Sequence, residues 1–187
     1  MKRFLALALT LAVSLTMAFS AAAGWEPPQG AVNAEAVVLY NVDTDTVVYE
    51  KNAHEVRAAA SLTKMMTGLL LAESGEDLSQ TFTIPEDLRP EFDRIQAENG
   101  SDADLKIGET VTLESLLYAC LLPSGNDAAS AIAYYLGNGD MQAFFDKMNA
   151  RAAELGCENT NFTCAHGLYG LEYGNHSTAW DMFLIAR

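Results

Sequence analysis

The alternation of apolar and polar residues after the N-terminal segment predicts a β-hairpin. Residues 34–40 alternate and are rich in β-branched side chains, residues 41–46 form a polar turn, and residues 47–49 continue as a second apolar run. Another short strand is expected over residues 81–84, where Pro85 ends the run. The sequence therefore predicts two short pieces of β-structure, both in the first half of the chain.

A helix is predicted to begin at Ser61. Gly75, which follows Ser74, supplies the residue that ends it. Apolar residues recur with the i, i+3, i+4, i+7, i+8 spacing of one helical face, namely Leu62, Met65, Met66, Leu69 and Leu70. Leu71 and Ala72 widen this stripe, so we expect the helix to be central and buried.

Further helices are predicted in the second half of the chain, over residues 113–122, 127–136, about 141–155 and 179–187. Thr112, Asp140 and Thr178 stand at N-cap positions, where their side chains can accept a backbone hydrogen bond. Three segments show no regular period and are expected to be loops, over residues 52–60, 85–108 and 157–176.

The composition fits a globular protein of one domain, or slightly more. The 187 residues are 50% hydrophobic and 19% charged, and neither a low-complexity tract nor an internal repeat occurs. The chain has 11 Lys and Arg against 25 Asp and Glu, which gives a net charge of -14. A chain this acidic is poorly suited to holding a phosphate backbone, so no nucleic-acid partner is expected.

Residues 1–23 have the regions of a secretory signal peptide. Lys2 and Arg3 form a positive start, an apolar run follows, and three consecutive alanines at 21–23 offer a cleavage site. A membrane anchor is the alternative, but the small residues at the end of the run favour cleavage. We therefore expect an exported, extracytoplasmic protein with a signal peptide over 1–23 and a linker over 24–33.

The three cysteines cannot close into a complete set of intramolecular disulfides, because their number is odd. Cys120 lies in an apolar run and is expected to be a buried thiol. Cys157 and Cys164 could pair across a short loop, which the sequence leaves open. The three histidines form no metal-ligand pattern with these cysteines, so a zinc site is not expected.

The motif Ser61-Leu62-Thr63-Lys64 carries candidate chemistry at the start of the predicted buried helix. A three-residue offset places Ser61 and Lys64 on one helical face, with Cβ atoms about 5–6 Å apart. A serine hydroxyl is a weak nucleophile until a base takes its proton, and burial favours the neutral form of lysine that can do so. Backbone N–H groups at the helix start can stabilise an oxyanion beside Ser61.

A second motif, Ser124-Gly125-Asn126, lies in the break between two predicted helices. A loop at such a break can point a hydroxyl and a carboxamide into a cleft. The hydroxyl can pass a proton between a lysine and a leaving group, and the carboxamide can hydrogen-bond a peptide-like substrate. The same three residues are also ordinary turn chemistry, so the two motifs together are more specific than either alone.

Together these motifs resemble those of the low-molecular-weight penicillin-binding proteins that act as D-alanyl-D-alanine carboxypeptidases. The resemblance covers nearly all of residues 34–187, and it is carried by residues 49–53, 60–67, 105–112, 122–129, 166–168 and 176–179. It implies an α+β fold of the serine β-lactamase and penicillin-binding-protein type, with an antiparallel sheet and a helical subdomain. It also implies an acyl-serine mechanism that uses no metal or other cofactor.

Carried over residue by residue, the resemblance makes Ser61 the nucleophile and Lys64 its base. Ser124 would relay protons, Asn126 would hold the substrate amide, and Lys64 would also help to activate water for deacylation. The implied partners are peptidoglycan stem peptides ending in D-Ala-D-Ala, with β-lactams as covalent inhibitors. Membrane association is implied only through a C-terminal region that family members often carry and this chain does not include.

The sequence departs from the family pattern in two places. Cys164-Ala165 precedes His166-Gly167 where the family commonly has Asn-Pro. No Lys-Thr-Gly or Lys-Ser-Gly follows Asn126, although the family places this third motif on a strand that meets the substrate carboxylate. We therefore expect residues 34–187 to be the N-terminal part of a catalytic domain whose C-terminal sheet strands are missing, and the 187-residue chain by itself to be inactive and poorly folded.

Three other functions remain open from the sequence. A class A β-lactamase would share the fold, but the second motif has Gly125 in place of Asp, and no Glu-x-x-Leu-Asn segment follows. A non-catalytic module that binds the cell wall or β-lactams would not need Ser61 and Lys64. An inactive fragment would explain the absence of the third motif.

Overall fold

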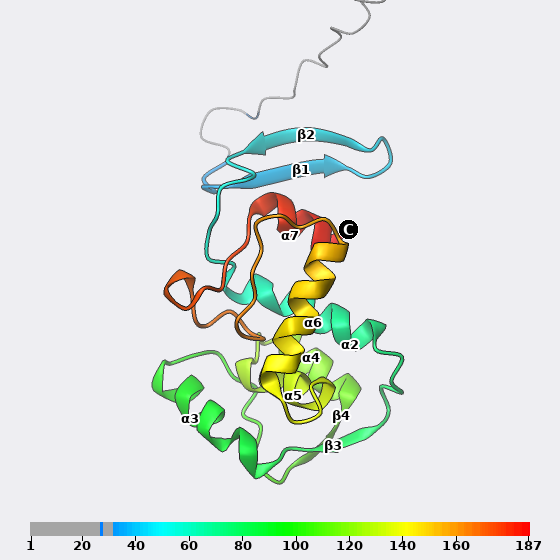
Figure 1. Cartoon of the computed structure of the whole chain (residues 1–187), viewed down its shortest axis with the longest axis vertical. Coiled ribbons are helices and arrows are strands. Elements are labelled where there is room, and N and C mark those ends of the chain that lie inside the picture. The colour runs from blue at the N-terminus through cyan, green and yellow to red at the C-terminus, as the bar shows by residue number, and fades with distance from the viewer. Residues whose placement is uncertain (1–26, 28–31) are drawn as a thin grey trace, which may run out of the picture. The chain divides into compact units, whose positions relative to one another are not determined.

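The computed structural model of the chain describes residue 27 and residues 32–187. The described residues fall into two units, one that ends at Lys51 and one over Asn52–Arg187. The signal peptide predicted over 1–23 lies outside the described residues, as does most of the linker predicted over 24–33. The hairpin of the first unit and the helical second unit are labelled in Figure 1.

The described part of the first unit is the predicted β-hairpin. Strand β1 (Val37–Asn41) pairs antiparallel with strand β2 (Thr46–Lys51). In the turn, the Thr44 N–H donates to Asn41 Oδ1 over 3.1 Å, and this local contact of a side chain with the backbone helps to hold the reversal. Asp45 takes a positive φ of 52°, a conformation that aspartate tolerates better than most residues.

The second unit is mainly helical. Helix α5 packs against α2, α3, α4 and α6, and α2 also contacts α7. Half of the buried residues of α5 are alanines, and small side chains allow neighbouring helices to approach closely. The helices are α2 (Thr63–Glu73), α3 (Arg89–Ala97), α4 (Leu113–Leu121), α5 (Asn126–Leu136), α6 (Met141–Glu154) and α7 (Ala179–Ala186).

The predicted helix ends are confirmed by the hydrogen bonds at their caps. Thr112 accepts from the Ser115 N–H, Asp140 from the N–H groups of Gln142 and Ala143, and Thr178 from the Asp181 N–H. Gly75 follows α2 with a φ of +76°, as expected of a residue that ends a helix. Local sequence signals are therefore sufficient to position most of these helices.

The loop predicted over residues 85–108 is wrong in its first half. A 3-10 turn (Glu86–Leu88) leads directly into α3, and Pro90 lies in the first turn of that helix, where its missing N–H costs no hydrogen bond. Leu88, Phe92 and Ile95 are buried, so an i, i+4, i+7 apolar face was present in the sequence. The abundant charged residues between these positions obscured that face.

A second pair of strands lies in this unit. Strand β3 (Thr81–Thr83) confirms the strand predicted over 81–84, and it pairs antiparallel with β4 (Thr110–Thr112), which was not predicted. Each of these strands has three residues, and a run this short carries little periodic signal. The chain therefore mixes helices with short antiparallel strands, as the predicted α+β class requires.

The three cysteines are free thiols. Cys120 is buried in the core, as predicted, and burial raises its pKa to about 12. Burial likewise raises the pKa of Cys157 to about 11. Because all three thiols are free, Cys157 and Cys164 do not pair across the loop.

Among the described residues, no helix is both long and apolar enough to cross a membrane.

Candidate active site

Ser61 lies in a 3-10 turn (Ala60–Leu62) that leads directly into α2. The Ser61 residue is exposed, so a ligand can reach its hydroxyl. Backbone N–H groups in the first turn of a helical segment lack acceptors within that segment. Ala60, the residue before Ser61, has a φ of +47°, which is an uncommon conformation for alanine.

Lys64 lies one turn further along, and its side chain is buried. The Lys64 residue is only 2% exposed. Its Nζ lies 3.1 Å from Ser61 Oγ and 3.0 Å from the carbonyl oxygen of His166. The structure therefore brings the predicted serine and lysine together, and it adds a third group from a segment about 100 residues away.

The surroundings of Lys64 favour its neutral form. Burial lowers the pKa of the Lys64 amine, because removing the ammonium group from water is costly. The nearby carboxylate of Asp127 opposes this shift but does not cancel it. A lysine with a lowered pKa is neutral in a larger fraction of molecules and can accept a proton.

Ser124 lies between α4 and α5, and its hydroxyl donates to Ser61 Oγ over 3.0 Å. Its φ of +62° turns the chain so that this contact can form. The following Gly125 N–H donates to the Ala119 carbonyl, which closes the end of α4. Ser61 Oγ therefore lies within hydrogen-bond distance of both the Lys64 amine and the Ser124 hydroxyl.

Asn126, the fourth predicted site residue, is placed differently. It is the first residue of α5 and is 3% exposed, and its backbone N–H donates to the Ser101 carbonyl. Its Nδ2 packs against Gly100, where an added Cβ would lie 2.6 Å away. Within the described part of the chain, no hydrogen bond joins its side chain to Ser61, Lys64 or Ser124.

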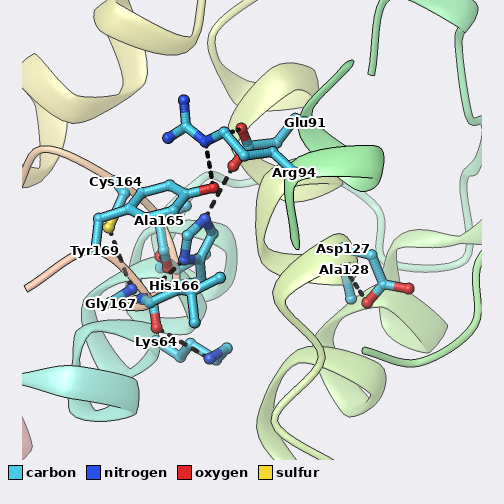
Figure 2. Close-up of polar contacts among 12 residues, drawn as sticks. Lys64, Glu91, Arg94, Asp127, Ala128, Cys164, Ala165, His166, Gly167 and Tyr169 are labelled. Atoms are coloured by element: carbon cyan, nitrogen blue, oxygen red, sulfur yellow. Dashed lines mark hydrogen bonds and ion pairs between the residues drawn. The ribbon is translucent and has the colours of Figure 1, made fainter. Parts of the chain in front are cut away.

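Asp127 is a structural residue of the site that the sequence analysis did not single out. Its buried carboxylate accepts from the N–H groups of Ala103, Leu105 and Ala128 over 2.8–2.9 Å. Figure 2 shows its contact with Ala128 at the start of α5. The carboxylate therefore ties the 103–105 segment to the helix that begins at Asn126.

The segment 164–168 runs beside α2 and supplies contacts that the sequence did not predict. The Ala165 carbonyl accepts from Thr67 Oγ1 over 2.6 Å, and the His166 carbonyl accepts from Lys64. Cys164 Sγ accepts from the Gly167 N–H over 3.2 Å. In the sequence, residues 166–168 match the family pattern, but that match assigned no role to any of them.

The arrangement can activate a serine. An exposed hydroxyl lies between a buried amine and a second hydroxyl, and the amine can take the proton as the oxygen attacks an electrophile. Within the described residues, no group of three or more His, Cys, Asp or Glu side chains is arranged to hold a metal ion. The chemistry that this arrangement supports is acyl transfer to serine.

Solved structures similar to this chain include a DD-transpeptidase and a D-alanyl-D-alanine carboxypeptidase. The chain superposes on the crystal structure of the Streptomyces K15 DD-transpeptidase with a TM-score of 0.73 and 36% identity, over 87% of this chain and 61% of that one. It superposes on the D-alanyl-D-alanine carboxypeptidase DacD of Francisella tularensis with a TM-score of 0.73 and 34% identity, over 87% of this chain and 38% of that one. The fold is therefore α+β, of the serine β-lactamase and penicillin-binding-protein type, as predicted.

The model of the D-alanyl-D-alanine carboxypeptidase family matches residues 21–187, and the chain belongs to that family. It is 37% identical to the D-alanyl-D-alanine carboxypeptidase DacF of Bacillus subtilis over 190 aligned residues, which cover 100% of this chain and 47% of that protein. The D-alanyl-D-alanine carboxypeptidase of Streptomyces strain K15 is 36% identical, over 94% of this chain and 60% of that protein. The chain thus spans about half the length of the curated relatives that it matches.

Proposed function

We propose that this chain carries the nucleophile and base of a serine D-Ala-D-Ala carboxypeptidase that trims peptidoglycan stem peptides. The observation that carries the proposal is the position of Ser61 Oγ, 3.1 Å from Lys64 Nζ and 3.0 Å from Ser124 Oγ. Family membership supports the substrate class, because the relatives are named for D-alanyl-D-alanine. The reaction uses protein side chains and water only.

Acylation begins with the neutral Lys64 amine taking the proton of Ser61 Oγ. The oxygen attacks the carbonyl carbon of the penultimate D-Ala and forms an oxygen–carbon bond. The Ser61 N–H, in the first turn of the helical segment, supports the developing oxyanion. The proton then passes through Ser124 to the amine of the terminal D-Ala, and the carbon–nitrogen bond breaks to release that residue.

Deacylation returns the enzyme to its starting state. Lys64 takes a proton from a water molecule, and the water oxygen attacks the acyl carbon. Lys64 then returns the proton to Ser61 Oγ as the bond between that oxygen and the acyl carbon breaks. The Asn126 carboxamide is proposed to hydrogen-bond the substrate amide once substrate displaces its packing against Gly100. β-Lactams are proposed to acylate Ser61 by the same attack and to act as covalent inhibitors.

The acceptor of the acyl group decides which reaction follows. Water gives a carboxypeptidase, and an amine from a second stem peptide gives a transpeptidase. Proteins from Streptomyces strain K15 carry both names, one for each reaction. We assign hydrolysis here because the family description and DacF are both named for the carboxypeptidase.

The proposed site of action is outside the cytoplasmic membrane. The signal peptide predicted over residues 1–23 and the peptidoglycan substrate both support export. N-terminal sequencing of the exported protein is expected to begin at Gly24. An exported protein that retains Met1 would contradict the predicted cleavage.

The test of the function measures D-Ala release from a peptide ending in D-Ala-D-Ala by the full-length protein. The Ser61→Ala variant is expected to lose at least about 1000-fold in turnover, because the nucleophile is removed. Ser79→Ala, which changes an exposed serine that bonds Asp77, is the matched control and should keep wild-type turnover. Release of D-Ala at the wild-type rate by Ser61→Ala would overturn the proposal.

A further inference from the structure

Lys64 is positioned by a backbone carbonyl as well as by Ser61. The His166 carbonyl accepts from Lys64 Nζ over 3.0 Å, so any movement of residue 166 moves this acceptor. The side chain of the same residue is 1% exposed and points away from Lys64, toward α3 (Figure 2). The His166 side chain is therefore joined to Lys64 through its own backbone carbonyl.

Both ring nitrogens of His166 have partners. Nδ1 accepts from the Leu168 N–H over 3.0 Å, so Nε2 carries the proton and donates to Glu91 Oε1, also over 3.0 Å. The first contact is local, within the 164–168 segment. The second joins this segment to α3, the helix that the sequence analysis missed.

Glu91 is itself held by its neighbours on α3. Arg94, three residues further along the helix, lies 3.8 Å from Glu91 Oε2. The Arg94 guanidinium also stacks 3.9 Å over the Tyr169 ring, and its Nε donates to the Tyr169 hydroxyl over 2.6 Å. Tyr169 packs edge-on against the His166 ring at 5.1 Å. Arg94 thus links the Glu91 carboxylate to Tyr169, which packs against the same His166 ring.

We propose that Glu91 is a positioning residue for Lys64, acting through the side chain and backbone carbonyl of His166. The link runs from α3 to the Glu91 carboxylate, the His166 ring, the His166 carbonyl and the Lys64 amine. This inference rests on the proposed function. It adds a group that neither touches substrate nor belongs to the serine motifs.

Displacement of an aligned catalytic group by about 1 Å can cost on the order of 100-fold in rate. A carbonyl that accepts from the ammonium form of a lysine also favours that form, so losing the acceptor lowers the lysine pKa. The other titratable groups near His166 are Arg94, Cys164 and Tyr169. They remain in place in a variant that changes Glu91 alone.

The test compares Glu91→Ala with Glu91→Gln in the full-length protein. Glutamine keeps an oxygen that can accept from His166 Nε2, whereas alanine leaves that donor without its acceptor. We expect Glu91→Ala to lower the limiting rate of acylation by penicillin about tenfold or more, with an unchanged constant for the preceding non-covalent complex. Glu91→Gln is expected to stay within about threefold of wild type, which is rescue by the conservative variant.

Two further variants separate positioning from stability. Glu86→Ala removes an exposed carboxylate that pairs with Arg89 just before α3, and it should leave acylation unchanged. His166→Asn can still accept from the Leu168 N–H but is too short to reach Glu91. Because both changes act through one link, Glu91→Ala combined with His166→Asn should lose little more than the worse single variant.

The Lys64 pKa, followed by NMR in the same variants, gives a readout that does not need activity. Glu91→Ala is expected to lower it further by about half a unit, and Glu91→Gln to leave it unchanged. An unchanged Lys64 pKa and acylation rate in Glu91→Ala would overturn the inference, and so would equal losses in Glu91→Ala and Glu86→Ala. A wild-type protein that penicillin does not acylate would overturn the proposed function, and the NMR shift would then decide the positioning role alone.

Discussion

Ser124 holds a backbone conformation that serine seldom adopts. Its φ of +62° lies in the left-handed region, where a residue other than glycine costs about 1–2 kcal/mol. The same conformation directs its hydroxyl to Ser61 Oγ, 3.0 Å away. Strain of this kind persists where the surrounding structure enforces it, and it concentrates at functional sites.

Two substitutions of Ser124 should distinguish the effect of the backbone strain on stability from the effect of the hydroxyl on acylation. Ser124→Ala and Ser124→Gly both remove the proposed proton relay, and both are expected to slow acylation about 100-fold. Only glycine relieves the left-handed φ, so Ser124→Gly should be about 1 kcal/mol more stable than Ser124→Ala. Thermal unfolding and penicillin acylation of the two variants check this. Equal stability of the two would show that the conformation is not strained.

The pH dependence of acylation should follow Lys64. Because burial lowers its pKa below the usual 10.5, the neutral fraction grows as the pH rises through that lowered value. The acylation rate is therefore expected to rise along a limb whose midpoint lies below 10.5. Lys64→Arg should give a slow and flat profile, because a guanidinium stays protonated throughout. A wild-type profile without this limb would contradict the proposed base.

The same shift predicts a stability change of definite sign. Between the lowered pKa of folded Lys64 and 10.5, the unfolded chain binds more protons at this residue than the folded chain does. The contribution of Lys64 to the free energy of unfolding therefore rises with pH across that window, and its destabilising effect is fully present below it. Unfolding in denaturant at several pH values should show this slope in wild type and not in Lys64→Met.

At the scale of elements, the 164–168 segment approaches the start of α2 more closely than a side chain would allow. Gly167 has a φ of +79°, and a Cβ added there would lie 1.8 Å from the Ala60 carbonyl oxygen. Ala60 directly precedes Ser61. The segment that supplies the His166 carbonyl to Lys64 therefore also contacts the backbone beside the proposed nucleophile.

Gly167→Ala should accordingly disturb both stability and acylation. We expect a loss of about 3 kcal/mol or more, from the left-handed φ together with the clash against Ala60. Gly174→Ala is the matched control, since Gly174 has a similar φ of +82° but an added Cβ there would meet only ordinary contacts. It should lose about 1–2 kcal/mol and keep its acylation rate. Equal losses in the two variants would mean that the close approach has no energetic consequence.

The elements differ in how far the sequence could predict them. The helix starts at Thr112, Asp140 and Thr178 were predictable because each depends on residues within one turn. The buried face of the helix that contains α2 was not predictable. The expected apolar stripe includes Leu62, which is 52% exposed, and omits Lys64, which is buried. Lys64 bonds a carbonyl that lies 102 residues away, and no local pattern encodes such a partner.

At the scale of the whole molecule, three of the four predicted site residues meet. Ser61, Lys64 and Ser124 form one hydrogen-bonded group, which two separate sequence motifs and a family resemblance were sufficient to predict. Asp127 follows the second motif directly, whereas His166 and Glu91 lie in segments to which no catalytic role was assigned. Packing of the helices brings them together, so only the structure could reveal them.

The chain spans about half the length of its curated relatives, so the activity is best tested at the full length of the protein. The expected role of a Lys-Thr-Gly strand in holding the substrate carboxylate is assigned to no residue of these 187. The residues from Asn52 to Arg187 form one compact unit that contains all four predicted site residues. We therefore propose Ser61, which lies within this unit, as the nucleophile.

Peptide mapping by mass spectrometry after reaction with penicillin tests that claim most directly. The full-length protein is expected to gain the mass of one penicillin, located on the peptide that contains Ser61. Ser61→Ala should gain no mass, and Ser79→Ala should react as wild type does. An adduct located on Ser124 or a cysteine, or an adduct that persists in Ser61→Ala, would contradict the assignment of Ser61 as the nucleophile.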